Sequence, residues 1–238
     1  MTMTAIEVFK QLVPLFQKEG YQIYMVGGSA RDFLLKRDFD DLDLATDAPP
    51  SRLIEMFPEA NHRFIKYGNI HFVLEEVSVD ITALRVESEY SDARHPHRIT
   101  FVDSIQKDAR RRDFTINALY IDPAFHVHDF FGGLEDLSQG VIRMIGDPNI
   151  RLCEDPLRIV RALRFSLLLG FQLDEDLSKA MHLYHARLEK LTKAKVKQEI
   201  IKMRIIDEKK TIEILEKYQI SGWQDCDTSE EYARIKDT

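Results

Sequence analysis

The chain has 238 residues, of which 44% are hydrophobic and 31% charged, and its formal net charge is −7. This composition predicts a packed chain rather than a disordered one, and no apolar run approaches the roughly 18 residues of a membrane span. Two cysteines without a C-x-x-C pair argue against a disulfide scaffold or a zinc site. We therefore expect a cytoplasmic protein with no membrane partner, in which any nucleic-acid partner is recognised by local basic clusters.

A helix followed by a strand is expected at the start of the chain. Apolar residues recur at helical spacing before Gly20, namely Ile6, Phe9, Leu12, Val13 and Phe16. Residues 21–26 then form a short aromatic and branched run that is typical of a strand. The Gly27-Gly28 pair predicts a turn, and Ser29 is the expected N-cap of the helix that follows.

The middle of the chain predicts a sheet with a polar insertion. Residues 41–45 predict a strand and residues 51–57 a short helix, whereas residues 63–85 are typical of consecutive strands of one sheet. The chain then turns polar over residues 87–98, which predicts a mobile loop.

A Gly-Asp-Pro break at residues 146–148 marks the expected domain boundary. Four segments with a helical period follow it: residues 154–170, 174–191, 193–206 and 209–220. The predicted organisation is a mixed sheet-and-helix domain over residues 1–147 and an all-helical part over residues 148–238.

Two carboxylates share one face of the strand expected near residue 42. Side chains two residues apart in a strand project to the same side, so Asp41 and Asp43 point together while Leu42 and Leu44 face the core. Like charges this close repel unless a cation lies between them, and oxygen-preferring divalent ions suit this role. The pattern indicates a Mg²⁺ site for phosphoryl transfer, although a D-x-D pair by itself is a weak motif.

A third carboxylate is expected from the strand that contains Asp80. Ser78, Asp80 and Thr82 share the polar face of this strand, and we predict Asp80 as the third metal ligand. The alternative is a solvent-facing acid on an edge strand. The eight histidines show no ligand spacing, so we assign them structural roles.

The glycine pair precedes an Arg-Asp pair in a way that favours phosphate binding. At Gly28 the missing side chain would let a triphosphate approach the backbone, and a helix N-terminus favours anions. Arg31 lies within reach of the same phosphates. A Gly-Gly pair alone is usually only a turn, but Arg31-Asp32 and the D-x-D about ten residues later make the combination specific.

Four blocks in order resemble one family. They are "GGSARD…DLDLATDA", "RRDFTINAL" (residues 111–119), "GDP" (residues 146–148) and "EDPLRIVRALRF" (residues 154–165). As a set they resemble the bacterial tRNA nucleotidyltransferases and poly(A) polymerases, the class II branch of the polymerase-beta-like superfamily. The resemblance implies an α/β nucleotidyltransferase head with a mixed sheet, followed by an all-α neck.

The resemblance also implies roles for individual residues. It places Arg112 on the nucleotide, Asp113 near the ribose 2′-hydroxyl and Asn117 in support of both. Without the resemblance, the basic cluster would indicate a solvated basic turn or a nucleic-acid patch. The resemblance also makes Asp155 and Arg158 a protein template, which accepts hydrogen bonds from the exocyclic amines of C and A and rejects U and G. Without the resemblance, a surface ion pair between Asp155 and Arg158 is the simpler interpretation.

Two further arginines follow on the helix expected over residues 154–170. Arg161 and Arg164 continue the three-residue spacing, and we expect them to brace the template or to bind phosphate. The polar segment over residues 87–96 has the full length that the resemblance implies for CCA-adding or A-adding members.

The implied activity is addition of CMP and AMP from CTP and ATP to the tRNA 3′ end, with Mg²⁺ as cofactor. The alternatives are a poly(A) polymerase or A-adding enzyme, or a non-catalytic RNA- or nucleotide-binding fragment. There are two departures from the family pattern, and the first of them motivates the non-catalytic alternative. Family members continue well beyond residue 238, and Ala194-Lys195 stand where a Glu-Arg pair is usual. The oligomeric state is unknown from the sequence.

Overall fold

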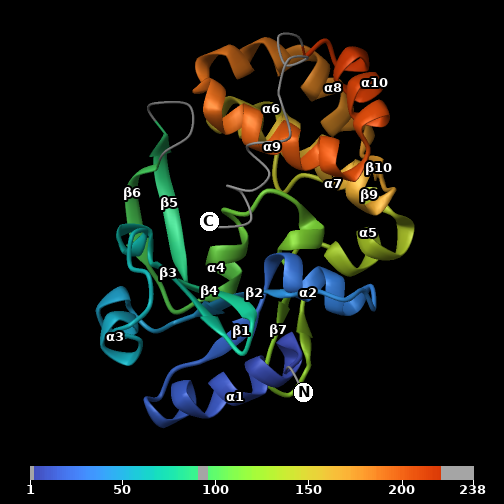
Figure 1. Ribbon diagram of the computed structural model, residues 1–238. Coiled ribbons are helices and arrows are strands. Elements are labelled where there is room, and N and C mark those ends of the chain that lie inside the picture. Colours follow the sequence, from blue (N-terminus) through green and yellow to red (C-terminus); the bar gives the residue numbers. More distant parts are fainter. Residues whose placement is uncertain (1–2, 91–95, 221–238) are drawn as a thin grey trace. The chain divides into compact units, whose positions relative to one another are not determined.

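The computed structural model describes residues 3–90 and 96–220, which divide into two compact units (Figure 1). The first unit contains residues 3–89 and 97–137, and the second contains residues 138–220 together with residues 90 and 96. The predicted boundary between residues 147 and 148 stays a prediction, and the division into compact units falls ten residues before it. Among the described residues, every helix is too short or too polar to span a membrane.

The first unit is built on a six-stranded sheet in the order β3-β4-β2-β1-β7-β8. Its strands are β1 (Ile23–Met25), β2 (Asp41–Thr46), β3 (Asn69–Leu74), β4 (Val77–Ala83), β7 (Tyr120–Ile121) and β8 (Val127–His128). The β2–β4 pair is parallel and the other pairs are antiparallel. The mixed sheet predicted from the sequence is therefore confirmed.

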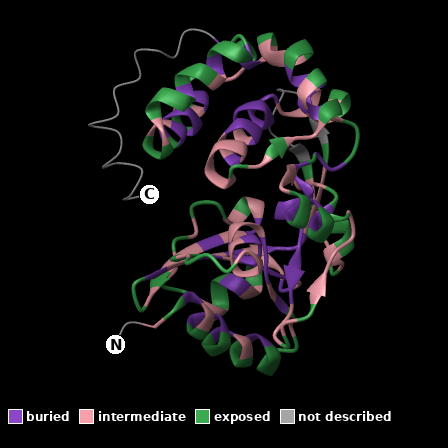
Figure 2. Cartoon of the chain, turned by 90° about the vertical axis from the view of Figure 1, so that its right-hand side faces the viewer, coloured by how far each residue is buried: buried purple, intermediate pink, exposed green. Residues whose placement is uncertain are grey.

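The two faces of this sheet differ in polarity. Strand β4 alternates strictly between buried and half-buried residues, as the sequence predicted, and the burial of Leu42 and Leu44 on β2 agrees with their expected core positions. Figure 2 shows buried residues concentrated on the strands and on the inward faces of the helices. The opposite face of the sheet carries the acids.

Helix α1 (Ala5–Lys18) confirms the first predicted helix. A capping box between Thr4 and Glu7 satisfies its first turn, and its apolar stripe is buried, including Phe9, Leu12 and Phe16. Helix α3 (Pro50–Met56) is also as predicted.

The N-cap of helix α2 (Gly27–Leu34) lies three residues earlier than expected, so the prediction of Ser29 as N-cap is wrong. The N-cap is Val26, which has no side-chain cap. The Ser29 hydroxyl instead donates to the Asp41 carbonyl at 2.9 Å and accepts from the Asp43 N–H at 2.6 Å. The Ser29 hydroxyl therefore forms hydrogen bonds with β2 and does not cap the helix.

Two further predictions need correction. Residues 63–68 are not a strand, because Ile65–Tyr67 form the short 3₁₀ helix η1, which ends at Gly68 with φ +77°. Much of the expected loop over residues 87–98 is the strand pair β5 (Arg85–Tyr90) and β6 (Pro96–Phe101). Residues 91–95 lie outside the described part of the chain.

The remaining elements of the first unit are short. They are α4 (Ile105–Ala109), η2 (Thr115–Asn117) and, ending in the second unit, α5 (Gly133–Gln139).

The second unit is mainly helical, as predicted. Its helices are α6 (Pro148–Glu154), α7 (Leu157–Leu169), α8 (Glu175–Tyr184), η3 (His185–Lys190), α9 (Lys193–Ile206) and α10 (Glu208–Lys217). Helix α7 packs on α9, and α6 packs on α8. A short parallel pair, β9 (Val141–Ile142) with β10 (Gln172–Leu173), is the one departure from an all-helical arrangement among these residues.

Candidate functional site

The three predicted metal ligands lie on the polar face of the sheet. Asp41 and Asp43 project from β2, and Asp80 on β4 is the register partner of Asp43. Asp41 is exposed and Asp43 is half-buried, whereas Leu42 between them is buried. The strand alternation predicted from the sequence therefore brings Asp41 and Asp43 to one side, with Asp80 beside them on the adjacent strand.

The glycine pair contacts the acid at its centre. The Gly28 N–H donates to Asp43 Oδ2 at 2.9 Å. A Cβ at Gly27 would lie 2.9 Å from the same oxygen, and one at Gly28 would lie 3.1 Å from it. Gly27 also has φ +65°, a conformation that favours glycine. Gly27 is therefore favoured both by its backbone conformation and by the approach of the Asp43 carboxylate, and Gly28 leaves little room for a side chain there, a reason that the sequence did not reveal.

Asp80 has protein partners of its own. Its Oδ1 accepts from Asn69 Nδ2 at 3.1 Å, and its Oδ2 lies 3.3 Å from His71 Nδ1. Among the described residues, no three His, Cys, Asp or Glu side chains converge as a ready-made metal site. The donor set nevertheless suits a hard divalent cation, because all three side chains are carboxylates on one face of paired strands. His71 was assigned a purely structural role, so its contact with Asp80 was missed.

The acid face, formed by Asp41, Asp43 and Asp80, brings three acidic side chains close together in the absence of a cation. Burial raises the pKa of Asp43 above its ordinary value, and the charges of Asp80 and Asp41 add to this increase. The hydrogen bond from Gly28 and the charge of Arg112 oppose it. The ionised form of Asp43 is thus disfavoured in the isolated chain, and a bound cation would relieve that cost.

Arg31 is held inside the first unit. Its side chain is 5% exposed, with Nε and Nη2 donating to the Asp32 carboxylate and Nη1 donating to Asn117 Oδ1 at 3.0 Å. The Asn117 amide in turn donates to Asp113 Oδ1 at 3.4 Å. The structure therefore joins Arg31, Asn117 and Asp113, three predicted nucleotide-binding residues, in one hydrogen-bonded chain between α2 and η2.

Arg112 is fixed by two neighbours. Its Nε donates to Tyr120 Oη at 2.9 Å and to Asp108 Oδ2 at 3.3 Å, and its guanidinium lies over the Tyr120 ring. Asp108 was not among the predicted site residues. Its spacing of three and four residues before Arg111 and Arg112, typical of helical ion pairs, was a signal that could have found it.

In the second unit, Asp155 and Arg158 do not lie on one helix, although the helical period of residues 154–170 predicted a helix over both. Asp155 lies before α7 with extended φ and ψ, and its Oδ1 accepts the Leu157 N–H at 3.1 Å. Pro156 is the reason, since a residue before proline is disfavoured in the helical region. Arg158 is 6% exposed, and its Nη1 donates to Glu154 Oε2 at 3.2 Å and to the Arg151 carbonyl at 2.7 Å.

Arg161 and Arg164 follow on α7 and share one aromatic neighbour. Their guanidinium carbons lie 5.4 and 4.4 Å from the Phe165 ring centre. Arg164 Nε also donates to Glu199 Oε2 on α9 at 2.7 Å. Arg164 thus joins α7 to α9, and the expected role of Arg161 and Arg164 in bracing the template or binding phosphate stays a prediction.

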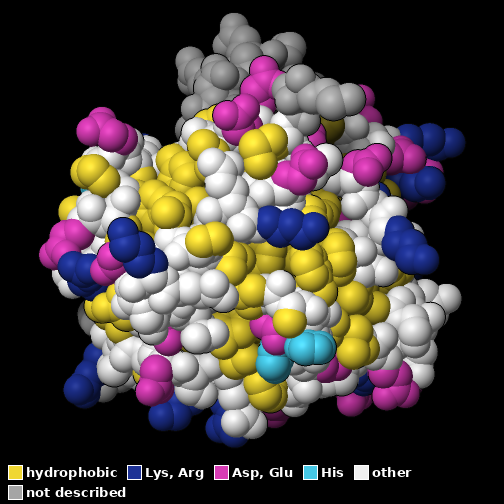
Figure 3. Space-filling view, turned by 90° about the horizontal axis from the view of Figure 1, so that it is seen from below, with side chains coloured by type: hydrophobic (Ala, Val, Ile, Leu, Met, Phe, Trp, Pro, Cys, Tyr) yellow, Lys and Arg dark blue, Asp and Glu magenta, His cyan; other side chains and the backbone are white. Residues whose placement is uncertain are grey.

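Basic side chains do not form one large surface in the view of Figure 3. Lys and Arg side chains are scattered there among acidic and hydrophobic ones. This agrees with the formal charge of −7, which gives the chain no net attraction for an anionic ligand.

A family model and a curated relative match this chain. The model described as poly A polymerase head domain matches residues 23–143. The CCA-adding enzyme of Lactobacillus helveticus (strain DPC 4571) is 40% identical over 202 residues, which cover 84% of this chain and 51% of that enzyme. The chain spans about half the length of the curated relatives it matches.

Two solved structures match the fold. The Bacillus stearothermophilus CCA-adding enzyme in complex with CTP gives a TM-score of 0.83 at 28% identity, covering 98% of this chain and 57% of that one. The Thermotoga maritima CCA-adding enzyme complexed with tRNA_CCA gives a TM-score of 0.71 at 26% identity, covering 90% and 50%. The predicted fold class, a mixed α/β head followed by a helical region, is confirmed.

Proposed function

Because the chain belongs to the poly(A) polymerase head domain family and its curated relatives are CCA-adding enzymes, we propose that it is a template-independent RNA nucleotidyltransferase. It adds CMP and AMP from CTP and ATP to the 3′ end of tRNA. The observation that carries this proposal is the pair Asp41 and Asp43 on the polar face of β2, with Gly27-Gly28 packed against the Asp43 carboxylate.

The acid face would hold the cofactor. Asp41, Asp43 and Asp80 are the residues that would bind Mg²⁺, which when bound activates the RNA 3′-hydroxyl and neutralises the leaving pyrophosphate. Ser29 fixes the backbone of both β2 acids through its two hydrogen bonds. The role of these residues is therefore to present carboxylate oxygens at a fixed place beside the N-terminus of α2.

The nucleotide would be held by the residues around η2. Arg112 carries a positive charge for the triphosphate, and Asp113 accepts from the ribose 2′-hydroxyl. Asn117 keeps Asp113 in place through the hydrogen bond between their side chains. The Arg31 guanidinium, which is buried against Asp32 and Asn117, in turn keeps Asn117 in place.

Base selection would rest on Asp155 and Arg158 in the second unit. A carboxylate accepts from the exocyclic amine of C or A, and a guanidinium donates to their ring acceptors. U and G present a carbonyl in place of the amine, so the wrong base leaves polar groups unpaired. Glu154 and the Arg151 carbonyl hold Arg158 in one orientation, which is what a template requires.

The direct test uses the 238-residue chain, Mg²⁺ and tRNA that lacks its 3′-terminal CCA. CTP and ATP together should give three added nucleotides, which gel electrophoresis of labelled tRNA resolves. Incorporation of ATP alone would indicate an A-adding enzyme or a poly(A) polymerase. Binding of nucleotide without incorporation on any RNA would indicate a non-catalytic binding module.

Gly27→Ala tests whether the glycine pair serves the acid face. We expect a loss of transfer activity of about tenfold or more, because the new Cβ would displace the Asp43 carboxylate from its place. Gly20→Ala is the matched control, since Gly20 also has a positive φ but a Cβ added there would meet no atom within 4 Å. Both variants should lose about 1–3 kcal/mol of stability in denaturant unfolding, but only Gly27→Ala should lose activity. Equal activities of the two variants would show that the contact with Asp43 is unimportant.

A further inference from the structure

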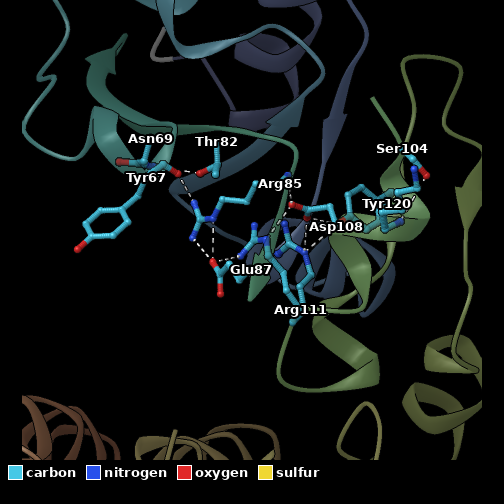
Figure 4. Close-up of polar contacts among 11 residues, drawn as sticks. Tyr67, Asn69, Thr82, Arg85, Glu87, Ser104, Asp108, Arg111 and Tyr120 are labelled. Atoms are coloured by element: carbon cyan, nitrogen blue, oxygen red, sulfur yellow. Dashed lines mark hydrogen bonds and ion pairs between the residues drawn. The ribbon is translucent and has the colours of Figure 1, made fainter. Parts of the chain in front are cut away.

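Asp108 on α4 is a buried carboxylate at the centre of a network of polar contacts (Figure 4). It is 0% exposed. Its Oδ1 accepts from the Arg85 N–H at 2.9 Å and from Arg111 Nε at 2.8 Å, whereas its Oδ2 accepts from Arg112 Nε and the Tyr120 hydroxyl. One side chain thus joins β5, the end of α4 and β7.

A carboxylate in this position cannot serve as a substrate contact. Burying a charge is costly unless it is paired and hydrogen-bonded, and here both oxygens have two donors each. Burial alone would raise the pKa of Asp108, but the charges of Arg111 and Arg112 and the bonds from Tyr120 and the Arg85 N–H lower it well below its ordinary value. Asp108 therefore stays ionised and acts on the site only through its partners.

The partner that matters for the reaction is Arg112. Asp108 and Tyr120 both accept from its Nε, and the Tyr120 ring lies 5.2 Å beneath its guanidinium. The guanidinium is thus held from its edge and from its face. It is also near enough to the acid face for its charge to lower the pKa of Asp43.

A second branch of the network joins Arg85 and Arg111 through Glu87. The Glu87 carboxylate accepts from Arg85 Nε at 2.8 Å and lies 3.5 Å from Arg111 Nη1. Figure 4 shows this branch between Arg85 and Arg111. Glu87 is a carboxylate between arginines, as Asp108 is, so it provides a matched control within the same network.

We propose that Asp108 is a positioning residue for nucleotide binding, which holds the Arg112 guanidinium in the orientation that receives the incoming nucleoside triphosphate. This inference rests on the proposed function and extends it to a residue that touches neither nucleotide nor metal. Tyr120 is the second part of the same support, because its hydroxyl bonds to both Asp108 and Arg112.

The experiment measures the Kd of ATP by calorimetry and the KM and kcat for nucleotide addition. Asp108→Asn keeps the shape of the side chain and removes its charge, so we expect Kd and KM to rise about tenfold with a smaller change in kcat. Tyr120→Phe should also raise Kd and KM, but by a smaller factor. This variant provides the test if Asp108→Asn does not fold. Glu87→Gln should leave Kd and KM within about twofold, because Glu87 pairs with Arg85 and Arg111.

A double-mutant cycle separates positioning from general stabilisation. If Asp108 acts through Arg112, Asp108→Asn should add nothing to the ATP Kd of Arg112→Ala, so that the two effects are not additive. Additive effects, or unchanged Kd and KM in both Asp108→Asn and Tyr120→Phe, would overturn the inference. ATP binding without transfer in the original chain would refute the proposed catalysis, while the cycle in Kd would still decide the role of Asp108.

Discussion

Replacing Asp43 with asparagine is expected to reduce nucleotide transfer by at least about 10²–10³-fold while making the chain more stable. The activity falls because a carboxylate of the acid face is lost. The stability rises because the pKa of Asp43 is raised by burial and by Asp80 and Asp41, so its ionised form weakens folding. Removing that charge should raise the melting temperature by roughly 2–4 °C for each kcal/mol of relieved repulsion.

The sign of this effect depends on pH in a way that can be measured. A carboxyl whose pKa is higher in the folded chain costs nothing below its ordinary pKa of about 3.9, and the cost grows as pH rises through the folded pKa. The gain from Asp43→Asn should therefore be present at pH 7 and absent below about pH 4. Mg²⁺ should stabilise the original chain more than the variant.

Asp38→Asn is the control for this prediction, because Asp38 is an exposed acid that precedes β2. Neither activity nor melting temperature should change measurably. If Asp43→Asn retained full transfer activity, the assignment of β2 as the metal-binding strand would be wrong. If it lowered the melting temperature at pH 7, the electrostatic interpretation would be wrong.

Replacing Asp155 with asparagine is expected to relax the choice of nucleotide. The asparagine amide can donate to the carbonyl of U or G, whereas the carboxylate can only accept. We expect the preference for CTP and ATP over UTP and GTP, measured as the ratio of kcat/KM values, to fall by about 10²-fold or more. The amide oxygen can still accept the hydrogen bond from the Leu157 N–H, so the start of α7 should remain folded.

Asp207→Asn provides the comparison for this substitution. Asp207 likewise accepts a backbone N–H at the start of a helix of the second unit, that of Lys210 in α10, but it is not part of the proposed template. Its variant should keep the original selectivity. Equal selectivity of Asp155→Asn and the original chain would exclude Asp155 from base recognition.

The parts of the fold that follow local periodicity could be predicted from the sequence. The alternation of buried and polar residues on β2 and β4 fixed the side on which Asp41, Asp43 and Asp80 lie. Helix α1 followed in the same way from its apolar spacing. The strand pair β5–β6 was missed because the sequence of β5, RVESEY, has few apolar residues to indicate a period.

The rest of the site depends on contacts between distant segments. Ser29 was expected to cap a helix, but it bonds to β2 residues more than ten positions later. Asp108 accepts hydrogen bonds from Arg85 and Tyr120, each more than ten positions away in the sequence. Local propensity contains no information on such partners, so they appear only when the sheet brings them together. The extended Asp155, in contrast, was predictable from the proline that follows it.

The position of the metal is the most direct test of the proposed function. Crystals of the chain grown with Mn²⁺ and a non-hydrolysable ATP analogue would locate it by anomalous scattering. We expect a peak bound to the carboxylates of Asp41 and Asp43 and to the triphosphate. A bound nucleotide with no metal peak at these two carboxylates would contradict the assignment of β2 as the catalytic strand.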